Sequence, residues 1–307
     1  MGNKPNVTAE IALIWPTSPA VCHTDIPCSP SRGTVVEVSH PIPSVTDADV
    51  LTAVADPRRR VVLDGVHNFR DLGGYPADGG TTRWGTVYRA DGLQRLTPSD
   101  IDELRRRGRG AVIDLRTDAE LDERGRFPVD QHDVSFHHLP VLDRTWLPGD
   151  VPPFDNANDF LLWAYADMLR VGSDKLAAGL EIIAAAGDTP LVFHCAAGKD
   201  RTGLLAAFLL SVLGVPEHFI AADYAKTEEG MLSMRAAWRV AAEAQGPEAL
   251  AKMQSSPVHY FESPPEVMLV LLADLRAKHG TLVDYVRSLG VSDDAIAALR
   301  ERLIERH

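Results

Sequence analysis

Cysteine is scarce in this chain of 307 residues, which has only Cys22, Cys28 and Cys195. An odd count without regular spacing excludes a small scaffold held together by several disulfides. A single Cys22–Cys28 disulfide is the alternative to two incidental thiols, and we favour the thiols. Cys195 is then the residue on which any cysteine chemistry would depend.

Long apolar runs are also absent, because no stretch approaches the roughly 18 residues that a membrane-spanning helix needs. The first residues, Met1–Val7, lack the basic and then apolar order of a secretion signal. Asn6 stands where myristoylation requires serine or threonine. We therefore expect a cytoplasmic protein with no stable membrane anchor.

An excess of positive charge is missing as well. The chain has 31 Lys and Arg against 43 Asp and Glu, a net charge of −12. Nucleic-acid binding is not expected, because phosphate contacts need a basic face. Metal binding is not expected either: His137 and His138 are adjacent, so on a strand they point to opposite faces, and no cluster of further ligands completes a site.

What the chain does have is an unusual segment at residues 190–203, PLVFHCAAGKDRTG, followed by the apolar residues 204–214. The pattern predicts a short buried strand, a tight loop and an apolar helix. Cys195 stands at the end of the strand and Arg201 at the start of the helix, with five residues between them.

A loop this short can direct several backbone N–H groups at one point, where the helix dipole adds positive potential. The planar guanidinium of Arg201 matches two oxygens of a phosphoryl group. A free thiol titrates near ~8.5, and settings of this kind lower that value to roughly 3.5–7.5. The segment therefore predicts a thiolate nucleophile beneath a bound phosphate.

Strands and helices alternate upstream of this segment, over residues 86–115. Thr97 is a good N-cap with Pro98 at the first helical position. The alternation predicts an α/β fold in which helices flank a central, mostly parallel sheet. Ligands of such sheets bind at the carboxyl ends of the strands. Residues 217–305 predict a C-terminal helical segment, whose last helix covers Ser292–Ile304.

The turn-rich segment Asn68–Tyr75, NFRDLGGY, contains the adjacent charges Arg70 and Asp71. We expect these two side chains to pair with each other and stabilise the turn. The alternative is that one of them supports the phosphate loop from outside.

The Cys-x5-Arg pattern in HCAAGKDRT, together with NFRDLGGY upstream, resembles the atypical bacterial tyrosine phosphatases of the tyrosine phosphatase B-like family. The resemblance covers roughly residues 60 to 305 and implies a protein-tyrosine-phosphatase-like fold. We accordingly divide the chain into residues 1–60, an arm or small β appendage without assigned function, and a phosphatase domain over residues 61–307. Secretion without a recognisable signal stays open, because members of this family act outside the cell.

The resemblance implies a protein tyrosine phosphatase that works without a cofactor or metal, through a phosphocysteine on Cys195. Arg201 and the loop amides are expected to hold the phosphate. The phosphate-binding residues are then Ala196, Ala197, Gly198, Lys199, Asp200, Arg201 and Thr202.

The leaving oxygen needs a proton, which a carboxylic acid on a loop can supply. In the family this role is assigned to an aspartate in the context LPxxD, which matches Asp143. Asp200, inside the loop itself, is the competing residue. A structural role for Asp143, as a loop residue that caps a turn, is a further alternative. Residues 143–158, rich in Pro, Gly and Asp, are a candidate lid.

The expected substrates are phosphotyrosine proteins. Lys199 and Asp200 also resemble loop residues of dual-specificity and phosphoinositide phosphatases, which form the second interpretation. A non-catalytic phosphate-binding module is a remote alternative, since the loop lacks nothing essential. A sulfur-transfer or redox protein is disfavoured, because no Cys-x-x-Cys pair is present.

Overall fold

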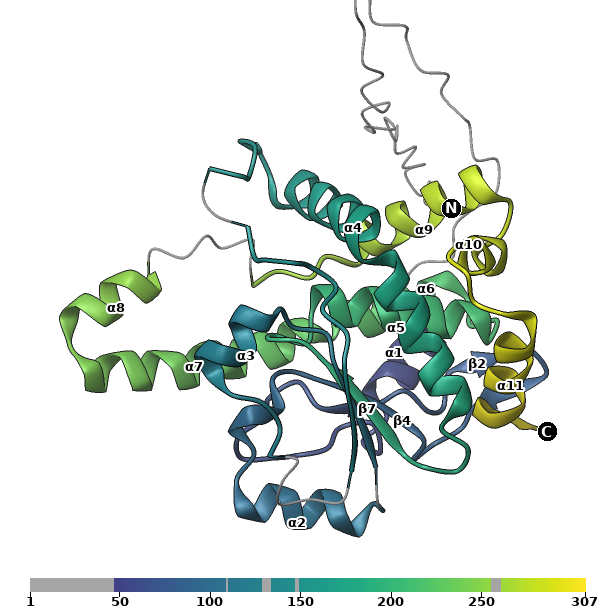
Figure 1. Cartoon of the computed structure of the whole chain (residues 1–307), viewed down its shortest axis with the longest axis horizontal. Coiled ribbons are helices and arrows are strands. Elements are labelled where there is room, and N and C mark those ends of the chain that lie inside the picture. Colours follow the sequence, from purple (N-terminus) through teal and green to yellow (C-terminus); the bar gives the residue numbers. More distant parts are fainter. Residues whose placement is uncertain (1–46, 109, 129–133, 147–148, 255–260) are drawn as a thin grey trace, which may run out of the picture. The chain divides into compact units, whose positions relative to one another are not determined.

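A computed structural model describes residues 47–108, 110–128, 134–146, 149–254 and 261–307 (Figure 1). Its central sheet has five strands in the order β1–β4–β7–β5–β6. The strands are β1 (Arg70–Asp71), β4 (Val87–Ala90), β5 (Ala111–Asp114), β6 (Ser135–His138) and β7 (Leu191–His194). Strands β4, β7, β5 and β6 run parallel, and only β1 is antiparallel to its neighbour. The prediction of a mostly parallel sheet is confirmed.

A second, antiparallel sheet has the order β2–β3–β8. Its strands are β2 (Pro76–Ala77), β3 (Gly80–Thr82) and β8 (Ile304–Arg306). Strand β8 corrects the expectation that the last helix reaches Ile304. That helix ends at Leu303. The residues after it pair with β3, and Ile304 lies opposite Thr82.

Helices cover both faces of the central sheet, as expected for this fold class. The helices of the described residues are α1 (Ala48–Ala55), η1 (Leu93–Arg95), α2 (Pro98–Arg106), α3 (Asp118–Arg124), α4 (Ala157–Ala185), α5 (Asp200–Val212), α6 (Glu217–Ala225), α7 (Thr227–Gln245), α8 (Pro247–Gln254), α9 (Pro265–His279), α10 (Leu282–Ser288) and α11 (Asp293–Leu303). The predicted cap of α2 is confirmed, since the Thr97 side chain accepts from the Asp100 N–H. Within the described ranges, every helix is too short or too polar to cross a bilayer.

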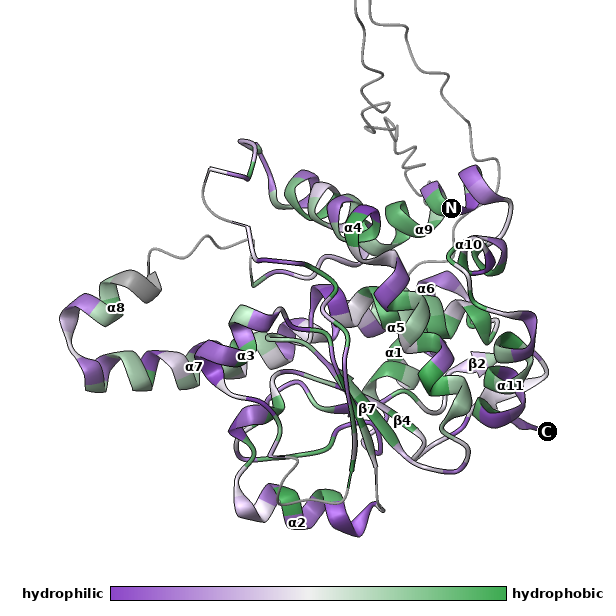
Figure 2. Ribbon diagram, in the orientation of Figure 1, coloured by the Kyte–Doolittle hydropathy of each residue, from purple (hydrophilic) through white to green (hydrophobic). Residues whose placement is uncertain are grey.

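The larger part of the core surrounds α5, which is buried from Arg201 to Val212. Figure 2 shows α5 as hydrophobic over most of its length, whereas α2 and α3 contain many polar residues. Helices α4, α6 and α10 pack against α5, and α2 lies on the other side of the strands (Figure 1). A helix without a polar face can only be stable in such a position.

The predicted arm over residues 1–60 falls mostly outside the described residues, as do Cys22 and Cys28. Its described part, residues 47–60, contains α1, which packs against α6 and buries Val50. The arm or small β appendage expected for the preceding residues stays a prediction.

Strand register brings the chemistry to one edge of the sheet. Ala90 pairs with His194, and Asp114 also pairs with His194. The carboxyl ends of β4, β5 and β7 are therefore level. The residues that follow them, including Asp91 and Cys195, lie at the edge where parallel sheets bind ligands.

Candidate active site

The loop that contains Cys195 joins β7 directly to α5, as the sequence predicts. Strand β7 ends at His194 and α5 begins at Asp200. Gly198 has a φ of 67°, and a Cβ there would lie 2.5 Å from the carbonyl oxygen of Ala90. The loop can therefore close against β4 only with glycine at this position.

Donors from neighbouring segments bond the carbonyl groups of the loop. Asn68 Nδ2 donates to the carbonyls of Ala197 and Gly198 at 3.1 and 3.2 Å. Arg89 donates to the Gly198 carbonyl at 2.8 Å. The Gly92 N–H donates to the Ala196 carbonyl at 3.2 Å.

In a trans peptide the N–H points away from the preceding C=O. Because the carbonyls of residues 196–198 face the protein scaffold, the N–H groups of residues 197–199 point to the opposite side. This arrangement has the geometry of an anion-binding nest at the start of a helix.

Cys195 and Arg201 occupy the two ends of this nest, and both are largely buried, at 2% and 8% exposure. Burial lowers the pKa of Arg201, but the negative charges of the Cys195 thiolate and of Glu120 outweigh burial and raise that pKa above its ordinary value. The guanidinium thus lies within electrostatic reach of the sulfur. It is cationic at all relevant pH values.

Glu120 is a site residue that the sequence interpretation missed. Its carboxylate accepts from both terminal nitrogens of Arg201, at 2.6 and 3.0 Å. Burial by itself would raise the pKa of Glu120, yet the bonds from Arg201 lower it to about 2. Glu120 also forms a capping box with Thr117 at the start of α3. The Thr-x-x-Glu spacing would have indicated the cap but not the contact with Arg201.

A buried charge network supports the loop from beneath. Asp223 accepts from Arg70 at 3.0 Å and from Arg89 at 2.6 Å, and all three side chains are almost fully buried. Burial would raise the pKa of Asp223, but the two guanidiniums hold it far below its usual range. Arg89 thus connects Asp223 to the Gly198 carbonyl.

The expected Arg70–Asp71 pair is wrong. The Arg70 side chain points to Asp223 and the side chain of Asn68. The Asp71 side chain instead accepts from the backbone N–H groups of Gly73 and Gly85. Adjacent residues of a strand point to opposite faces, so the two charges are separated by the backbone of β1. Arg70 supports the Cys195 loop through its contact with Asn68.

His194, which precedes the cysteine, is completely buried. Burial lowers its pKa below the ordinary value despite the neighbouring carboxylate of Asp114, so we assign the neutral ring. Its Nδ1 lies 3.2 Å from the Cys195 carbonyl. Its Nε2 is 3.4 Å from Asp114 but does not have hydrogen-bond geometry. Asp114 itself forms a buried ion pair with Arg116.

The two candidate acids lie in different surroundings. Asp200, at the first position of α5, accepts from the Tyr165 hydroxyl at 2.9 Å and lies 3.6 Å from Lys199 Nζ. Its side chain is 30% exposed. Asp143 follows β6, is exposed, and acts together with Asp174 to raise the pKa of Lys175 on α4. Asp200 thus lies in the Cys195 loop itself, whereas the charge on which Asp143 acts is that of Lys175 on α4.

Two further loop side chains are buried. Lys199 is 1% exposed beside Asp200. The Thr202 hydroxyl is buried and has no hydrogen-bond partner among the described residues. An unsatisfied buried hydroxyl is destabilising by about 1–3 kcal/mol, which points to a role with a charged group at the site.

Comparison with known proteins points to the same class of protein as this geometry. The profile of the tyrosine phosphatase family matches residues 61–305. A candidate tyrosine-protein phosphatase of Cupriavidus necator is 33% identical over 180 residues, which are 56% of this chain and 64% of that protein. The triple specificity protein phosphatase PtpB of Mycobacterium tuberculosis is 31% identical over 205 residues, which are 57% of this chain and 71% of that protein.

A crystal structure of Pseudomonas aeruginosa TpbA in complex with phosphotyrosine aligns with 55% of this chain and 79% of that chain. The TM-score is 0.31 and the identity 19%, so this likeness adds nothing to the argument.

The chain belongs to the tyrosine phosphatase family, because the matched residues cover most of its length. The family predicted from the two sequence motifs is thereby confirmed.

Proposed function

We propose that this protein hydrolyses phosphomonoesters through a phosphocysteine intermediate. One observation carries the proposal: the thiol of Cys195 and the guanidinium of Arg201 stand at the ends of one loop, within electrostatic reach of each other. The hydrogen bonds that Asn68 and Arg89 donate to the loop carbonyls also support it, because they turn the loop N–H groups to the opposite side. An acidic protein that acts on phosphate needs such a local concentration of positive potential.

In the first step the Cys195 sulfur attacks phosphorus and the ester P–O bond breaks. Arg201 and the N–H groups of the loop hold the equatorial oxygens and stabilise charge that develops in the transition state. In the second step a water attacks phosphorus, the P–S bond breaks and phosphate leaves. The Thr202 hydroxyl donates to the departing thiolate, which gives its buried O–H a partner.

We assign the leaving-group proton to Asp200. Its position next to Arg201 places a partly exposed carboxyl beside the phosphate site, and the Tyr165 hydroxyl orients it. Asp143 stays the alternative acid, since a loop can move toward a bound substrate. A cytoplasmic location is part of the same proposal.

Phosphotyrosine proteins are the proposed substrates, in line with the family. The relative from Mycobacterium tuberculosis is named for triple specificity, and the buried Lys199 adds a cation to the loop. Dual-specificity or phosphoinositide hydrolysis is therefore the second proposal. Phosphotyrosine and phosphoserine peptides assayed beside a soluble inositol phosphate would rank the three classes.

Hydrolysis of p-nitrophenyl phosphate in the presence of EDTA tests the mechanism, with Cys195→Ser as the partner variant. We expect turnover by the unchanged protein and none by the variant, which should still bind phosphate. Activity that persists in Cys195→Ser, or that EDTA abolishes, would refute the proposal.

A further inference from the structure

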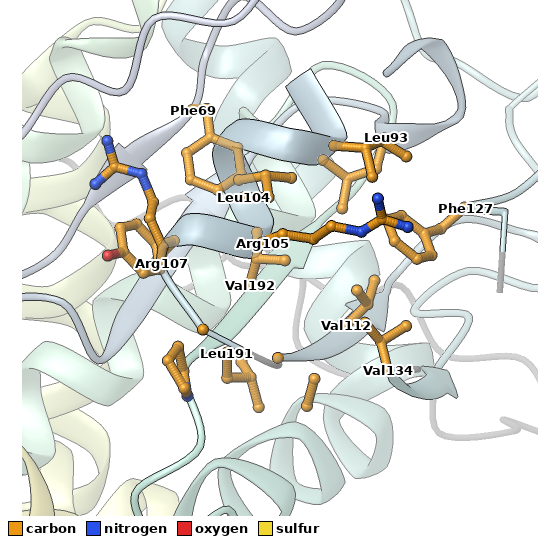
Figure 3. A pocket seen from close by; sticks show the side chains of 16 residues that line it. Phe69, Leu93, Leu104, Arg105, Arg107, Val112, Phe127, Val134, Leu191 and Val192 are labelled. Atoms are coloured by element: carbon orange, nitrogen blue, oxygen red, sulfur yellow. The ribbon is translucent and has the colours of Figure 1, made fainter. Parts of the chain in front are cut away.

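A cavity of about 520 Å³ lies between α2 and the central sheet (Figure 3). Its walls include Ile101 and Leu104 of α2 and Tyr88 of β4. The first two residues of β5 and of β7 also line it. Cys195 follows the carboxyl end of β7, so the cavity and the phosphate site lie toward opposite ends of the same strands.

The cavity has the size and lining of a ligand site. Its wall is largely apolar, and Phe69, Leu93, Val112 and Phe127 on that wall are buried. Protein interiors rarely leave voids larger than a water molecule. An apolar cavity of roughly 150 Å³ holds benzene, and pockets for small molecules span about 300–1,000 Å³. The space therefore fits an apolar molecule considerably larger than benzene.

The rim of the cavity is positively charged. Arg105 and Arg107 line it, and their side chains are 60% and 37% exposed. Figure 3 shows Arg105 running across the cavity toward Phe127, with Arg107 on the other side. Arg107 donates to Glu103 at 2.9 Å and Arg105 to Asp102 at 3.0 Å. Asp71 and Tyr88 also interact with Arg107. Among the described residues that line the cavity, however, the charged ones are Arg105 and Arg107, so the rim favours an anion.

We propose that this cavity binds an amphipathic carboxylate of the fatty-acid class. The acyl chain would lie against α2 and the strands, where its burial is favourable by about 0.8 kcal/mol per methylene. The carboxylate would remain at the rim beside Arg107 and Arg105. A neutral apolar molecule would fill the same space without using the charged rim.

Titration calorimetry with dodecanoate on the full chain tests the proposal, with dodecanol as the uncharged probe of equal chain length. We expect saturable binding of one dodecanoate per chain and weaker binding of dodecanol. Arg107→Gln should weaken dodecanoate binding about fivefold, the size of a partly exposed ion pair. Arg106→Gln is the matched control, because Arg106 also bonds Glu103 but does not line the cavity.

Two bulky substitutions test the location. Leu104→Trp and Val134→Phe each fill part of the cavity and should weaken binding at least tenfold, and their thermal unfolding would show which variant is folded. Inorganic phosphate, which we expect to bind at the Cys195 loop, should leave dodecanoate binding unchanged. Competition by phosphate, non-saturable binding, or undiminished binding to a folded Leu104→Trp or Val134→Phe protein would overturn the proposal.

Discussion

The carboxylate of Glu120 accepts two hydrogen bonds from the guanidinium of Arg201, a residue 81 positions further along the chain. Two of the five N–H donors of arginine are thereby occupied, and three remain for other acceptors. The pair sets the orientation of the guanidinium before substrate arrives. Such preorganisation lowers the barrier because the orientation is already present in the free enzyme.

Replacing Glu120 by glutamine should lower kcat/KM for p-nitrophenyl phosphate by about 10–100-fold, because the guanidinium loses its fixed position. Steady-state kinetics would measure the effect, and circular dichroism would show that α3 is retained. An unchanged kcat/KM in a folded variant would mean that Arg201 needs no partner to be held in place.

The same pair predicts a pH dependence of stability. The pKa of Glu120 is about 2 in the folded protein, against an ordinary value of 4.5. A lowered pKa stabilises the folded state above pH 4.5, and this contribution, about 3 kcal/mol, is lost as pH falls from 4.5 toward 2. The free energy of unfolding of the unchanged protein should therefore exceed that of Glu120→Gln at pH 6. The gap should shrink as pH falls below 4.5 and close only near pH 2, and a gap independent of pH would contradict this prediction.

Asp223→Asn should destabilise the fold by about 3–5 kcal/mol, because it leaves the buried guanidiniums of Arg70 and Arg89 without their counter-charge. Glu217→Gln is the matched control on the same helix. Glu217 pairs with the half-exposed Arg276, so its loss should change stability by less than about 1 kcal/mol. Urea denaturation of both variants would measure the difference, and equal losses would show that the Asp223 network contributes no more than a surface pair.

Gly198→Ala should impair both folding and turnover. The new Cβ would meet the Ala90 carbonyl at 2.5 Å, and the positive φ adds strain of about 1–3 kcal/mol. Gly187→Ala is the control, with a φ of 58° and open space around its Cβ. It should be only mildly destabilised, by about 1 kcal/mol, and keep full activity. If Gly198→Ala is as active as Gly187→Ala, the loop does not depend on the close approach to β4.

The general acid can be identified from leaving-group dependence. Asp200→Asn should slow hydrolysis of phenyl phosphate by about 10²–10⁴-fold and that of p-nitrophenyl phosphate much less, because only the poorer leaving group needs the proton. Asp143→Asn should leave both rates nearly unchanged. The reverse result would assign the acid to Asp143 and require its loop to move toward the substrate. Tyr165→Phe, which removes the bond to Asp200, should show a weaker form of the Asp200→Asn effect.

Local patterns predict the elements around the site well. Residues 190–214 form the predicted strand, loop and helix, because a continuous apolar run, a glycine-containing turn and a second apolar run each favour one local structure. Thr97 and Pro98 predict the start of α2 for the same reason. These signals act over a few residues and need no distant partner.

Contacts between residues far apart in the sequence could not be predicted from local patterns. Arg70 precedes Asp71 but binds Asp223, and the last residues continue past α11 as a strand because β3 offers them an open edge. The two candidate acids are both aspartates and differ only in their position in the fold. Asp200 is next to Arg201 by position, whereas the place of Asp143 depends on the course of the loop after β6.

The sequence by itself determined the reactive loop, the sheet class and the family, since each depends on residues that are neighbours in the chain or recur with a short period. Only the tertiary structure decided which carboxylate holds Arg201, which charges neutralise one another beneath the loop, and that a cavity lies under α2. Ion pairs and cavities are formed by side chains that folding brings together from distant segments, and their energies depend on burial, which a linear pattern does not contain.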